Sequence, residues 1–348
     1  MNIADRIIGR DQKPFVIAEM SGNHNQSLDR ALKLIDLAAD AKVDAIKLQT
    51  YTADTITIDH SGDEFRISDP NSLWTGKTLY DLYETAHTPW EWHGALFQRA
   101  HEKGLIIFSS PFDDTAVDFL ESLGAPAYKI ASFEFTDFEL IRKVLATGKP
   151  LILSTGMASL AEIDETVKMV RSSGNENFAL LKCTSSYPAD PLNSNISTIS
   201  YLRDIFGCEV GLSDHTMGIG VAAAAVAMGA TIIEKHFTDS RSEGGVDSAF
   251  SLEPDEMKSL VIEAERAHQS IGKVNFAPSG KNESNAVSFR RSLYICKDIK
   301  RGEAFTKENL RSIRPGLGLP VKNLPVFLGK SANQDIKRGT PLSWNFLG

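Results

Sequence analysis

Cysteine is scarce in this chain of 348 residues, and long apolar segments are missing. The three cysteines, Cys183, Cys208 and Cys296, are too few and too widely spaced for a disulfide framework or a CxxC-type zinc site. The most apolar run covers residues 218–233, which is shorter than the roughly 20 residues that a membrane-spanning helix needs. Residues 1–12 carry charges throughout and lack the apolar core of a signal peptide. We therefore expect a soluble, cytoplasmic protein.

The chain also lacks an excess of positive charge. Its 45 acidic residues outnumber its 37 lysines and arginines and give a formal net charge of −8. A surface that binds nucleic acid or anionic membranes without specificity is therefore not expected, although this balance leaves room for a local basic pocket. The hydrophobic content of 42% and the charged content of 24% are ordinary for a globular protein and argue against global disorder.

Short apolar, β-rich segments alternate with helical patterns from residue 15 to about residue 272. This alternation is typical of parallel strands joined by helices. The expected strands cover 15–20, 45–51, 105–112, 127–132, 150–156, 178–186, 209–215 and 231–238. The expected helices include 28–41, 91–103, 115–123, 137–146, 160–172, 219–228 and 254–271. Eight strands, each followed by a helix, predict a closed (β/α)₈ TIM barrel of the α/β class over residues 1–272.

Two segments depart from this alternation. The second crossover, residues 52–90, is long enough to contain an insertion, and insertions of that size are usually functional or disordered. Residues 273–289 are rich in Pro, Gly, Asn and Ser and read as a linker. Residues 290–348 follow with short β-like pieces and a near-repeat, DIKRG at 298–302 and again at 335–339. Two copies are too few for a solenoid, so we expect a small, pseudo-symmetric β domain with two equivalent turns.

Polar residues interrupt the apolar barrel strands near their C-terminal ends. Burying an unpaired charge is costly, so such residues normally have a partner or a ligand. The C-terminal ends of the strands face the active site in a (β/α)₈ barrel, so these residues mark its expected position. They are Glu19, Lys47, Gln49, Ser110, Lys129, Ser132, Ser154, Ser213, His215, Glu234 and His236.

His215 and His236 end two consecutive predicted strands. Neighbouring strands lie about 4.8 Å apart, so the two imidazoles could bind one divalent metal and leave coordination positions for water and substrate. The alternative is that each histidine is a hydrogen-bonded core residue. A matched pair at the ends of adjacent strands favours the metal.

Lys47 and Lys129, together with the serine hydroxyls, could hold a phosphate or a carboxylate by charge-assisted hydrogen bonds. In the alternative, the serines cap helices and the lysines pair with Glu19 or Glu234. Lys129 and Ser132 have opposite parity along their strand, so one of them must lie beyond the strand or past a bulge. A Schiff-base aldolase is a further alternative, and its candidate lysines are Lys47, Lys129, Lys182 and Lys235.

Two further features admit both a functional and a structural interpretation. The polar loop Gly22-Asn23-His24-Asn25 follows the first strand, and it could equally be a simple turn into the next helix. The insertion is rich in aromatic residues that could line a sugar site, although packing or a dimer contact is the more common role of such a segment. These residues are Trp74, Tyr80, Tyr83, Trp90 and Trp92.

Taken together, these motifs resemble the sialic acid synthase family, and within it most closely the pseudaminic acid synthase branch. The matching stretches are IAEMSGNHNQS (17–27), AIKLQTYTADTIT (45–57), LWTGKTLYDLYETAHTPWEWH (73–93), FSSPFD (108–113), YKIASFE (128–134), STGMAS (154–159), LLKCTSSYPA (180–189), GLSDHT (211–216), IEKHFT (233–238) and RSIRPGLGL (311–319). They are spread over nearly the whole chain. MSGNHNQ, where the family commonly has GVNHNG, and FSSPF, where it has FSTPF, are features of the pseudaminic branch.

The resemblance implies a fold, a reaction and a cofactor. The fold is a (β/α)₈ barrel followed by a small antifreeze-like (SAF) β domain. The reaction condenses phosphoenolpyruvate with an N-acetylated aldose, which in the pseudaminic branch is 2,4-diacetamido-2,4,6-trideoxy-L-altrose. The products are a nine-carbon 2-keto acid and phosphate. The cofactor is a divalent metal, Mn²⁺, Mg²⁺ or Co²⁺, held by His215 and His236.

The resemblance also implies residue roles. Phosphoenolpyruvate contacts are Lys47, Ser110, Lys129, Ser132, Ser154, Ser185 and Ser213, of which Ser185 stands where the family commonly has Asn. Glu19 is implied as a general acid and base. Sugar contacts are Gln49, Glu134, Tyr187 and Asp247, joined by Arg314 from the small domain of a partner subunit in a domain-swapped homodimer.

Alternatives to this function remain at the level of the sequence. The acceptor could be N-acetylmannosamine or the legionaminic acid precursor, which would make the chain an N-acetylneuraminate or legionaminate synthase. A non-enzymatic alternative makes residues 290–348 an ice-binding module, but the polar mouth of the predicted barrel argues against it.

Overall fold

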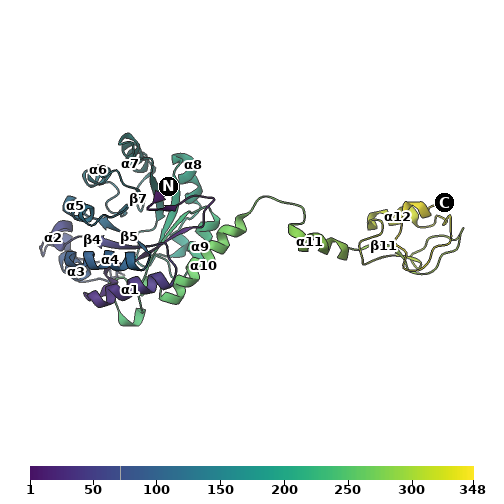
Figure 1. The fold of residues 1–348 in the computed structure, drawn as a ribbon, viewed down its shortest axis with the longest axis horizontal. Coiled ribbons are helices and arrows are strands. Elements are labelled where there is room, and N and C mark those ends of the chain that lie inside the picture. Colours follow the sequence, from purple (N-terminus) through teal and green to yellow (C-terminus); the bar gives the residue numbers. More distant parts are fainter. Residues whose placement is uncertain (71) are drawn as a thin grey trace. The chain divides into compact units, whose positions relative to one another are not determined.

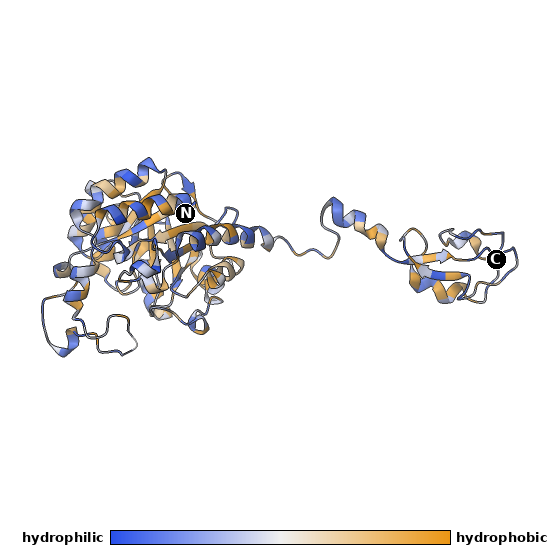
Figure 2. Cartoon of the chain, turned by 90° about the horizontal axis from the view of Figure 1, so that it is seen from below, coloured by the Kyte–Doolittle hydropathy of each residue, from blue (hydrophilic) through white to orange (hydrophobic). Residues whose placement is uncertain are grey.

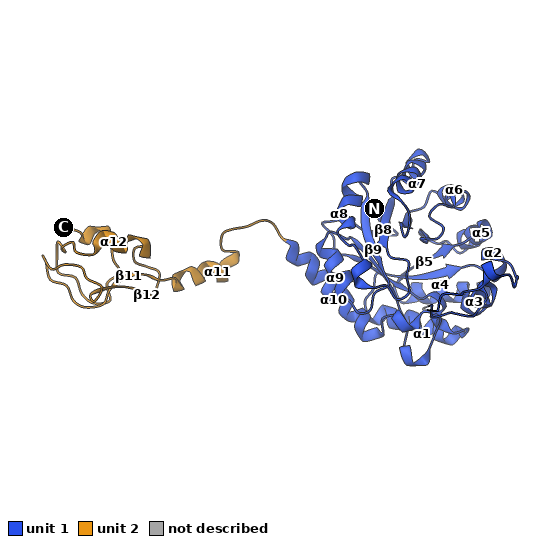
Figure 3. Cartoon of the chain, turned by 180° about the vertical axis from the view of Figure 1, so that it is seen from behind, with its two compact units in different colours: residues 1–271 blue, residues 272–348 orange. Residues whose placement is uncertain are grey.

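The computed structural model describes residues 1–70 and 72–348 and divides the chain into two compact units. The first unit is Met1–Ile271 and the second is Gly272–Gly348 (Figure 3). Each unit has its own hydrophobic core. Within the described residues, no helix combines the length and the apolar character that crossing a membrane requires.

The first unit is a closed barrel of eight parallel strands, which confirms the predicted fold class (Figure 1). Strand β10 pairs with β3, so the last barrel strand closes against the first, with His236 opposite Glu19. The strands are β3 (Phe15–Glu19), β4 (Ala45–Thr50), β5 (Ile106–Pro111), β6 (Tyr128–Ile130), β7 (Leu151–Ser154), β8 (Phe178–Cys183), β9 (Glu209–Asp214) and β10 (Ile232–His236).

Helices surround the barrel, and those that the sequence predicts begin and end within two residues of the predicted bounds. The helices of this unit are α1 (Leu28–Asp40), α2 (Ala53–Ile56), α3 (Leu79–Ala86), α4 (His93–Glu102), α5 (Asp114–Ser122), α6 (Phe138–Leu145), α7 (Leu160–Ser172), α8 (Thr198–Phe206), α9 (Gly220–Ala227) and α10 (Pro254–Ile271). Side-chain hydrogen bonds at the N-terminus fix where several of these helices begin. Ser159, for example, forms a capping box with Glu162 at the start of α7.

The structure adds elements that the sequence prediction did not include. Helix α8 buries Ile199, Leu202 and Phe206 and ends at Gly207, which has a left-handed backbone. Helices α2 and α3 lie within the insertion at 52–90. The short 3₁₀ helices are η1 (Ser21–His24), η2 (Asp63–Phe65), η3 (Trp90–Trp92), η4 (Pro191–Asn193), η5 (Arg241–Glu243), η6 (Ser248–Phe250), η7 (Val287–Phe289), η8 (Val321–Asn323) and η9 (Trp344–Phe346).

Two apolar clusters hold the barrel. The larger one packs the outward faces of the strands against the helices, and the smaller one fills the barrel interior with residues such as Phe15, Phe108 and Ile232. Figure 2 shows the barrel strands as largely hydrophobic and the helices as carrying both hydrophobic and hydrophilic residues. Because every barrel strand is covered on both sides, its few polar residues stand out as candidates for function.

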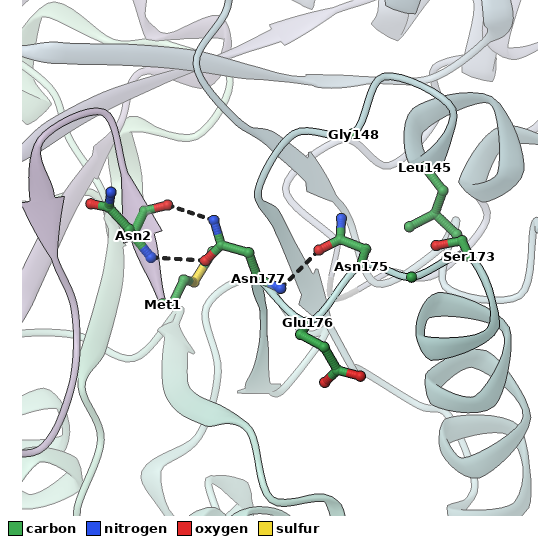
Figure 4. A pocket seen from close by; sticks show the side chains of 9 residues that line it. Met1, Asn2, Leu145, Gly148, Ser173, Asn175, Glu176 and Asn177 are labelled. Atoms are coloured by element: carbon green, nitrogen blue, oxygen red, sulfur yellow. Dashed lines mark hydrogen bonds between the residues drawn. The ribbon is translucent and has the colours of Figure 1, made fainter.

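The end of the barrel opposite the active-site mouth is closed by the N-terminus. Strands β1 (Asn2–Ile3) and β2 (Arg6–Ile7) form a small hairpin there, and Ile3 joins the interior cluster. Asn177 fastens this hairpin through two hydrogen bonds of 2.8 Å to the backbone of Asn2 (Figure 4). The pocket of about 590 Å³ beside it is lined by residues that precede β7 and β8, so it lies at the N-terminal strand ends and away from the polar cluster.

The second unit contains α11 (Gly280–Ala286), β11 (Ser292–Ile295), β12 (Leu310–Ile313) and α12 (Leu324–Phe327). Strands β11 and β12 pair antiparallel. The two DIKRG copies form equivalent turns, because Ile299 bridges Ile336 and the ion pairs are reciprocal. Lys300 pairs with Asp335 at 2.8 Å, and Lys337 pairs with Asp298 at 2.9 Å.

The barrel interior predicts the effect of one added methyl group. A Cβ at Gly211 of β9 would lie 2.2 Å from the carbonyl oxygen of Ile232 and 2.7 Å from Leu181, so the neighbouring strand would have to move. We expect Gly211→Ala to lower the free energy of unfolding by about 2–3 kcal/mol. Gly94→Ala, at an exposed position of α4 with open space around it, should change it by less than about 1 kcal/mol. Urea unfolding followed by circular dichroism measures both, and equal effects would contradict the packing argument.

Candidate active site

A buried charged cluster lies at the C-terminal ends of β3 and β4. The Nζ of Lys47 is 2.6 Å from Oε2 of Glu19 and donates a 3.3 Å hydrogen bond to Oγ of Ser110. Gln49 donates from Nε2 to Oε1 of Glu19 at 2.9 Å. Alternation along the strand places Lys47 and Gln49 on the same face, as the sequence predicts. Lys47 and Glu19 are almost completely shielded from solvent.

A second ion pair adjoins the first across the barrel. The Nζ of Lys129 donates to both carboxylate oxygens of Glu234, at 2.7 and 2.9 Å, and Ser213 donates to Oε1 at 3.0 Å. The Nζ of Lys47 lies 3.9 Å from Oε2 of Glu234, so this carboxylate joins the two lysines. The lysines are therefore brought together, and they are paired with Glu19 and Glu234, as one of the sequence interpretations held.

The two glutamates have different electrostatic surroundings. Burial raises the pKa of Glu19 to about 7, although Lys47 opposes this shift. Burial also acts on Glu234, but Lys129 and Lys47 outweigh it and lower the pKa of that carboxyl to about 2. When Glu19 is protonated, two ammonium groups face a single carboxylate, and the cluster carries net positive charge. Such a cluster suits an anionic ligand.

Three further serines of the predicted set lie at or just beyond the C-terminal ends of β6, β7 and β8. Ser132 and Ser185 lie 2.8 Å apart through their Oγ atoms, and the buried Oγ of Ser154 has no hydrogen-bond partner among the described residues. Strand β6 ends at Ile130, so Ser132 lies beyond the strand, which resolves its opposite parity to Lys129. Gly156 has a φ of +46°, and a Cβ there would lie 2.3 Å from Cβ of Ser132, so only glycine permits this close approach.

His215 and His236 lie next to each other, with ring centroids 5.2 Å apart. Nδ1 of His215 lies 2.9 Å from the backbone oxygen of Thr184, which can only accept a hydrogen bond, so Nδ1 carries a proton and Nε2 offers a lone pair when the ring is neutral. Burial opposes protonation of this ring, but the neighbouring Cys183 outweighs burial and raises the pKa of His215. Burial and the positive charge nearby hold the pKa of His236 well below its usual value, so this ring is neutral at physiological pH.

These features fit a divalent metal. A neutral imidazole is a good metal ligand, and an Nδ1–H bonded to a backbone carbonyl is a common way of orienting one. The Nδ1 of His236 is buried and has no hydrogen-bond partner among the described residues. Within that same part of the chain, no group of three or more His, Cys, Asp or Glu side chains is placed to hold a metal. The two imidazoles would therefore share the metal with water or substrate.

Asp247, Tyr187 and Phe250 enclose the two imidazoles. Oδ2 of Asp247 lies 3.5 Å from Nδ1 of His236 and accepts a hydrogen bond from Ser21. The ring of Tyr187 is 4.5 Å from that of His215. Phe250 is buried, and its ring is 4.9 Å from that of His236 and 6.2 Å from that of His215. Asp247 and Tyr187 therefore lie beside the candidate metal ligands.

Glu134 follows strand β6 and is, after Glu19, the second glutamate of this region whose pKa is raised. Its Oε2 is buried and has no hydrogen-bond partner among the described residues. Burial raises the pKa of Glu134 to about 7. A carboxyl that is half protonated near neutral pH can both donate and accept a hydrogen bond, which is useful toward a polyhydroxylated ligand.

Some of the sequence candidates lie elsewhere. Lys235 pairs with Asp214 at 2.7 Å, one position out of phase with the inward-facing Glu234 and His236. Lys182 donates to the carbonyl oxygen of Cys183 and to the hydroxyl of Thr184. Neither lysine joins the charged cluster.

Arg314 belongs to the second unit, where it is exposed, and its contact with the sugar of a partner subunit stays a prediction.

Of the aromatic residues in the insertion, Trp74 contacts Tyr187. Its ring is 5.9 Å from that of Tyr187, and its Nε1 donates to the backbone oxygen of Val246 at 3.0 Å. The others serve packing: Trp90 stacks on Phe119, and Trp92 contacts His24. Tyr83 contacts Tyr51, and Tyr80 bonds Asp54.

The sequence prediction gave no role to several residues that the structure places in the site. Glu234 was considered only as a polar residue near a strand end and as an alternative partner of the lysines, although its even spacing from His236 places the two on one face. Ser21 and Phe250 lie in the short 3₁₀ helices η1 and η6, where strand or α-helical periodicity gives no signal. Cys183 lies 4.0 Å from Nδ1 of His215, and its parity with Leu181 in the barrel interior was the available clue.

Comparison with known proteins identifies the family. The family model described as the NeuB family matches residues 34–276, and the model described as the SAF domain matches residues 290–348. The chain is 44% identical over 332 residues to the pseudaminic acid synthase of Campylobacter jejuni, covering 95% of this chain and 96% of that protein. It is 41% identical over 332 residues to the pseudaminic acid synthase of Helicobacter pylori, covering 95% and 97%.

A solved structure gives the same result. The N-acetylneuraminic acid (sialic acid) synthetase of Leptospira borgpetersenii, in complex with citrate, superposes with a TM-score of 0.73 at 33% identity. The match covers 82% of this chain and 94% of that one. These findings confirm the family resemblance that the motifs indicate, and the chain belongs to the NeuB family.

Proposed function

We propose that this chain is an enzyme of carbohydrate biosynthesis that makes pseudaminic acid. It condenses phosphoenolpyruvate with 2,4-diacetamido-2,4,6-trideoxy-L-altrose and water, and it releases phosphate. The observation that carries the proposal is that two buried lysines and two neighbouring imidazoles meet at one barrel mouth. The similarity to two pseudaminic acid synthases over 95% of the chain supports the choice of acceptor.

The lysine cluster is the proposed phosphoenolpyruvate site. Lys47 and Lys129 offset the negative charge of the phosphate and the carboxylate. Because both are paired with carboxylates, a bound substrate must take over part of those interactions. Serine hydroxyls supply uncharged donors around the cluster. The proposed set is Ser110, Ser132, Ser154, Ser185 and Ser213.

The imidazole side of the mouth is the proposed sugar and metal site. His215 and His236 would hold Mn²⁺, Mg²⁺ or Co²⁺, and such an ion would supply Lewis-acid polarisation of the aldehyde of the open-chain sugar. Asp247 and Tyr187 lie against these imidazoles and are proposed to bind sugar hydroxyl and acetamido groups. Gln49 and Glu134 are proposed to complete this side of the site.

The reaction follows from holding the two substrates in contact and away from water. C3 of phosphoenolpyruvate attacks the aldehyde carbon and forms the new C–C bond, while C2 becomes cationic. Water adds at C2 and loses a proton, and the aldehyde oxygen gains one. The tetrahedral intermediate then expels phosphate by cleavage of its C2–O bond and leaves the keto group. Glu19, whose pKa is raised to about 7, is suited to move these protons.

The assembly and location of the enzyme are part of the same proposal. We propose a cytoplasmic homodimer in which Arg314 of the small domain contributes a cation to the sugar site of the partner subunit. The runner-up acceptors are N-acetylmannosamine and the legionaminic acid precursor, because the chain is also similar to an N-acetylneuraminic acid synthetase.

The acceptor is tested by supplying the three sugars in parallel with phosphoenolpyruvate. We expect phosphate release with 2,4-diacetamido-2,4,6-trideoxy-L-altrose to be at least about tenfold faster than with either of the other sugars. A mismatched substituent in a fitted pocket lowers the reaction rate by about tenfold or more. The measurement is phosphate release under identical conditions. A preference for N-acetylmannosamine would contradict the proposed acceptor.

The metal is tested by removing it. Dialysis against EDTA should abolish turnover, and Mn²⁺, Mg²⁺ or Co²⁺ should restore it. His236→Gln should lower Mn²⁺ binding, measured by calorimetry on the metal-free protein, by at least about tenfold. His101→Gln, at an exposed position of α4, is the matched control and should bind as the wild type does. Full activity of the metal-free enzyme would contradict the assignment.

Glu134 predicts a pH-dependent stability. Its pKa is about 7 in the folded protein and about 4.5 when exposed, so its stabilising contribution is complete below pH 4.5 and is lost as the pH rises through 7. Glu134→Gln should therefore raise the free energy of unfolding at pH 8 by roughly 1–3 kcal/mol relative to the wild type, and much less at pH 5. Urea unfolding at both pH values measures this. Glu139→Gln on the surface of α6 is the control, and a pH-independent change would contradict the argument.

A further inference from the structure

The loop GNHN after the first barrel strand has a role that the proposed chemistry does not use. Its residues Gly22 to His24 are buried in the 3₁₀ helix η1, next to the loop that follows the last barrel strand. We call residues 237–253 the β10–α10 loop. The two loops meet because β10 closes the barrel against β3.

Asn23 connects to this loop at three places. Its Nδ2 donates to the backbone oxygen of Phe237 at 2.9 Å and to Oγ of Ser251 at 2.9 Å. Its Oδ1 accepts a hydrogen bond from the backbone N–H of Asp247 at 3.2 Å. Asn23 therefore holds the first residue of the β10–α10 loop and two positions in its C-terminal half, and its side chain is completely buried.

The loop residues that Asn23 bonds lie next to residues of the candidate active site. Phe237 directly follows His236 in the chain. Asp247 lies 3.5 Å from the His236 ring nitrogen, and Phe250, next to Ser251, packs on both imidazoles. A shift of the β10–α10 loop would therefore move the carboxylate and the aromatic ring that enclose the imidazole pair.

An asparagine side chain meets this requirement and its nearest alternatives do not. The site needs two donors and one acceptor from one short planar group, which a carboxylate lacks because it has no donors. Gly245 also approaches closely: a Cβ there would lie 2.8 Å from Oδ1 of Asn23. The packing leaves no space for a longer amide.

We infer that Asn23 is a positioning residue that seats the β10–α10 loop, and through it Asp247 and Phe250, against the two imidazoles. Its effect on the sugar rests on the proposed function, whereas its effect on the loop does not. Asn23 itself touches neither imidazole in the contacts described, so it acts through the loop.

The test compares the same chemical change at two asparagines of the GNHN loop. Asn23→Asp keeps the shape and removes the two donors. Asn25→Asp is the matched control, because Asn25 is exposed, holds only the loop tip through Glu243 and Gly244, and has a left-handed backbone that Asp tolerates. If Asn23→Asp does not fold, Asn23→Ser takes its place. The readouts are hydrogen exchange of the β10–α10 loop and the KM of each substrate.

For Asn23→Asp we expect amides of residues 239–251 to exchange about tenfold faster, which corresponds to the loss of one to two hydrogen bonds. The KM of the sugar should rise about tenfold or more, while that of phosphoenolpyruvate stays within about twofold. Asn25→Asp should leave the KM values and the exchange outside the loop tip unchanged.

Two results would overturn the inference. One is unchanged exchange of the β10–α10 loop in the Asn23 variant. The other is faster exchange throughout the barrel with a parallel rise of both KM values, which indicates a general loss of stability. If the wild type releases no phosphate with any sugar, the proposed function fails, and the comparison of loop exchange still decides the role of Asn23.

Discussion

The rest of this site depends on two lysines and two glutamates that are held away from water at the mouth of the barrel. Four charges in such a place are stable only when they pair with one another, and the barrel supplies the pairing by bringing β3, β4, β6 and β10 into one ring. Lys47 is therefore paired with Glu19, and Lys129 is paired with Glu234. An anionic substrate meets a preformed cluster whose net charge depends on the protonation of Glu19, so binding and proton uptake are coupled.

Most of the fold was predictable because the signals are local. A barrel strand is covered on both faces, so it reads as an apolar run, and the amphipathic period marks each intervening helix. The same pattern allowed the site to be predicted. Burying a side chain such as Lys47 or His236 in an apolar strand costs free energy unless the side chain has a partner. The predicted pairing of polar strand residues by parity also explains why Lys129 and Ser132 belong to different segments, with β6 ending between them.

The unpredicted part lies in loops and in partner choice. The spacing of these residues in the sequence does not show that Lys129 pairs with Glu234 and Lys47 with Glu19. The pairing depends on which strands are neighbours in the closed barrel and on the length of each side chain. Phe250 and Ser21 come from 3₁₀ turns, whose backbone follows no period. The roles of Asn23 and Ser251 were equally hidden, since they arise from contacts between segments more than two hundred residues apart.

That separation has a consequence for how the molecule is made. The barrel cannot close until β10 has left the ribosome. Phe237 and Ser251, to which Asn23 donates its hydrogen bonds, are synthesised after this last strand. Until then the lysines lack Glu234, and a nascent chain carries unpaired cations on an incomplete sheet. Late pairing of the two ends of a long sequence is slow and leaves partly folded chains open to aggregation. A chain that ends before β10 would therefore lack both Glu234 and His236, which leaves the charged cluster and the imidazole pair incomplete.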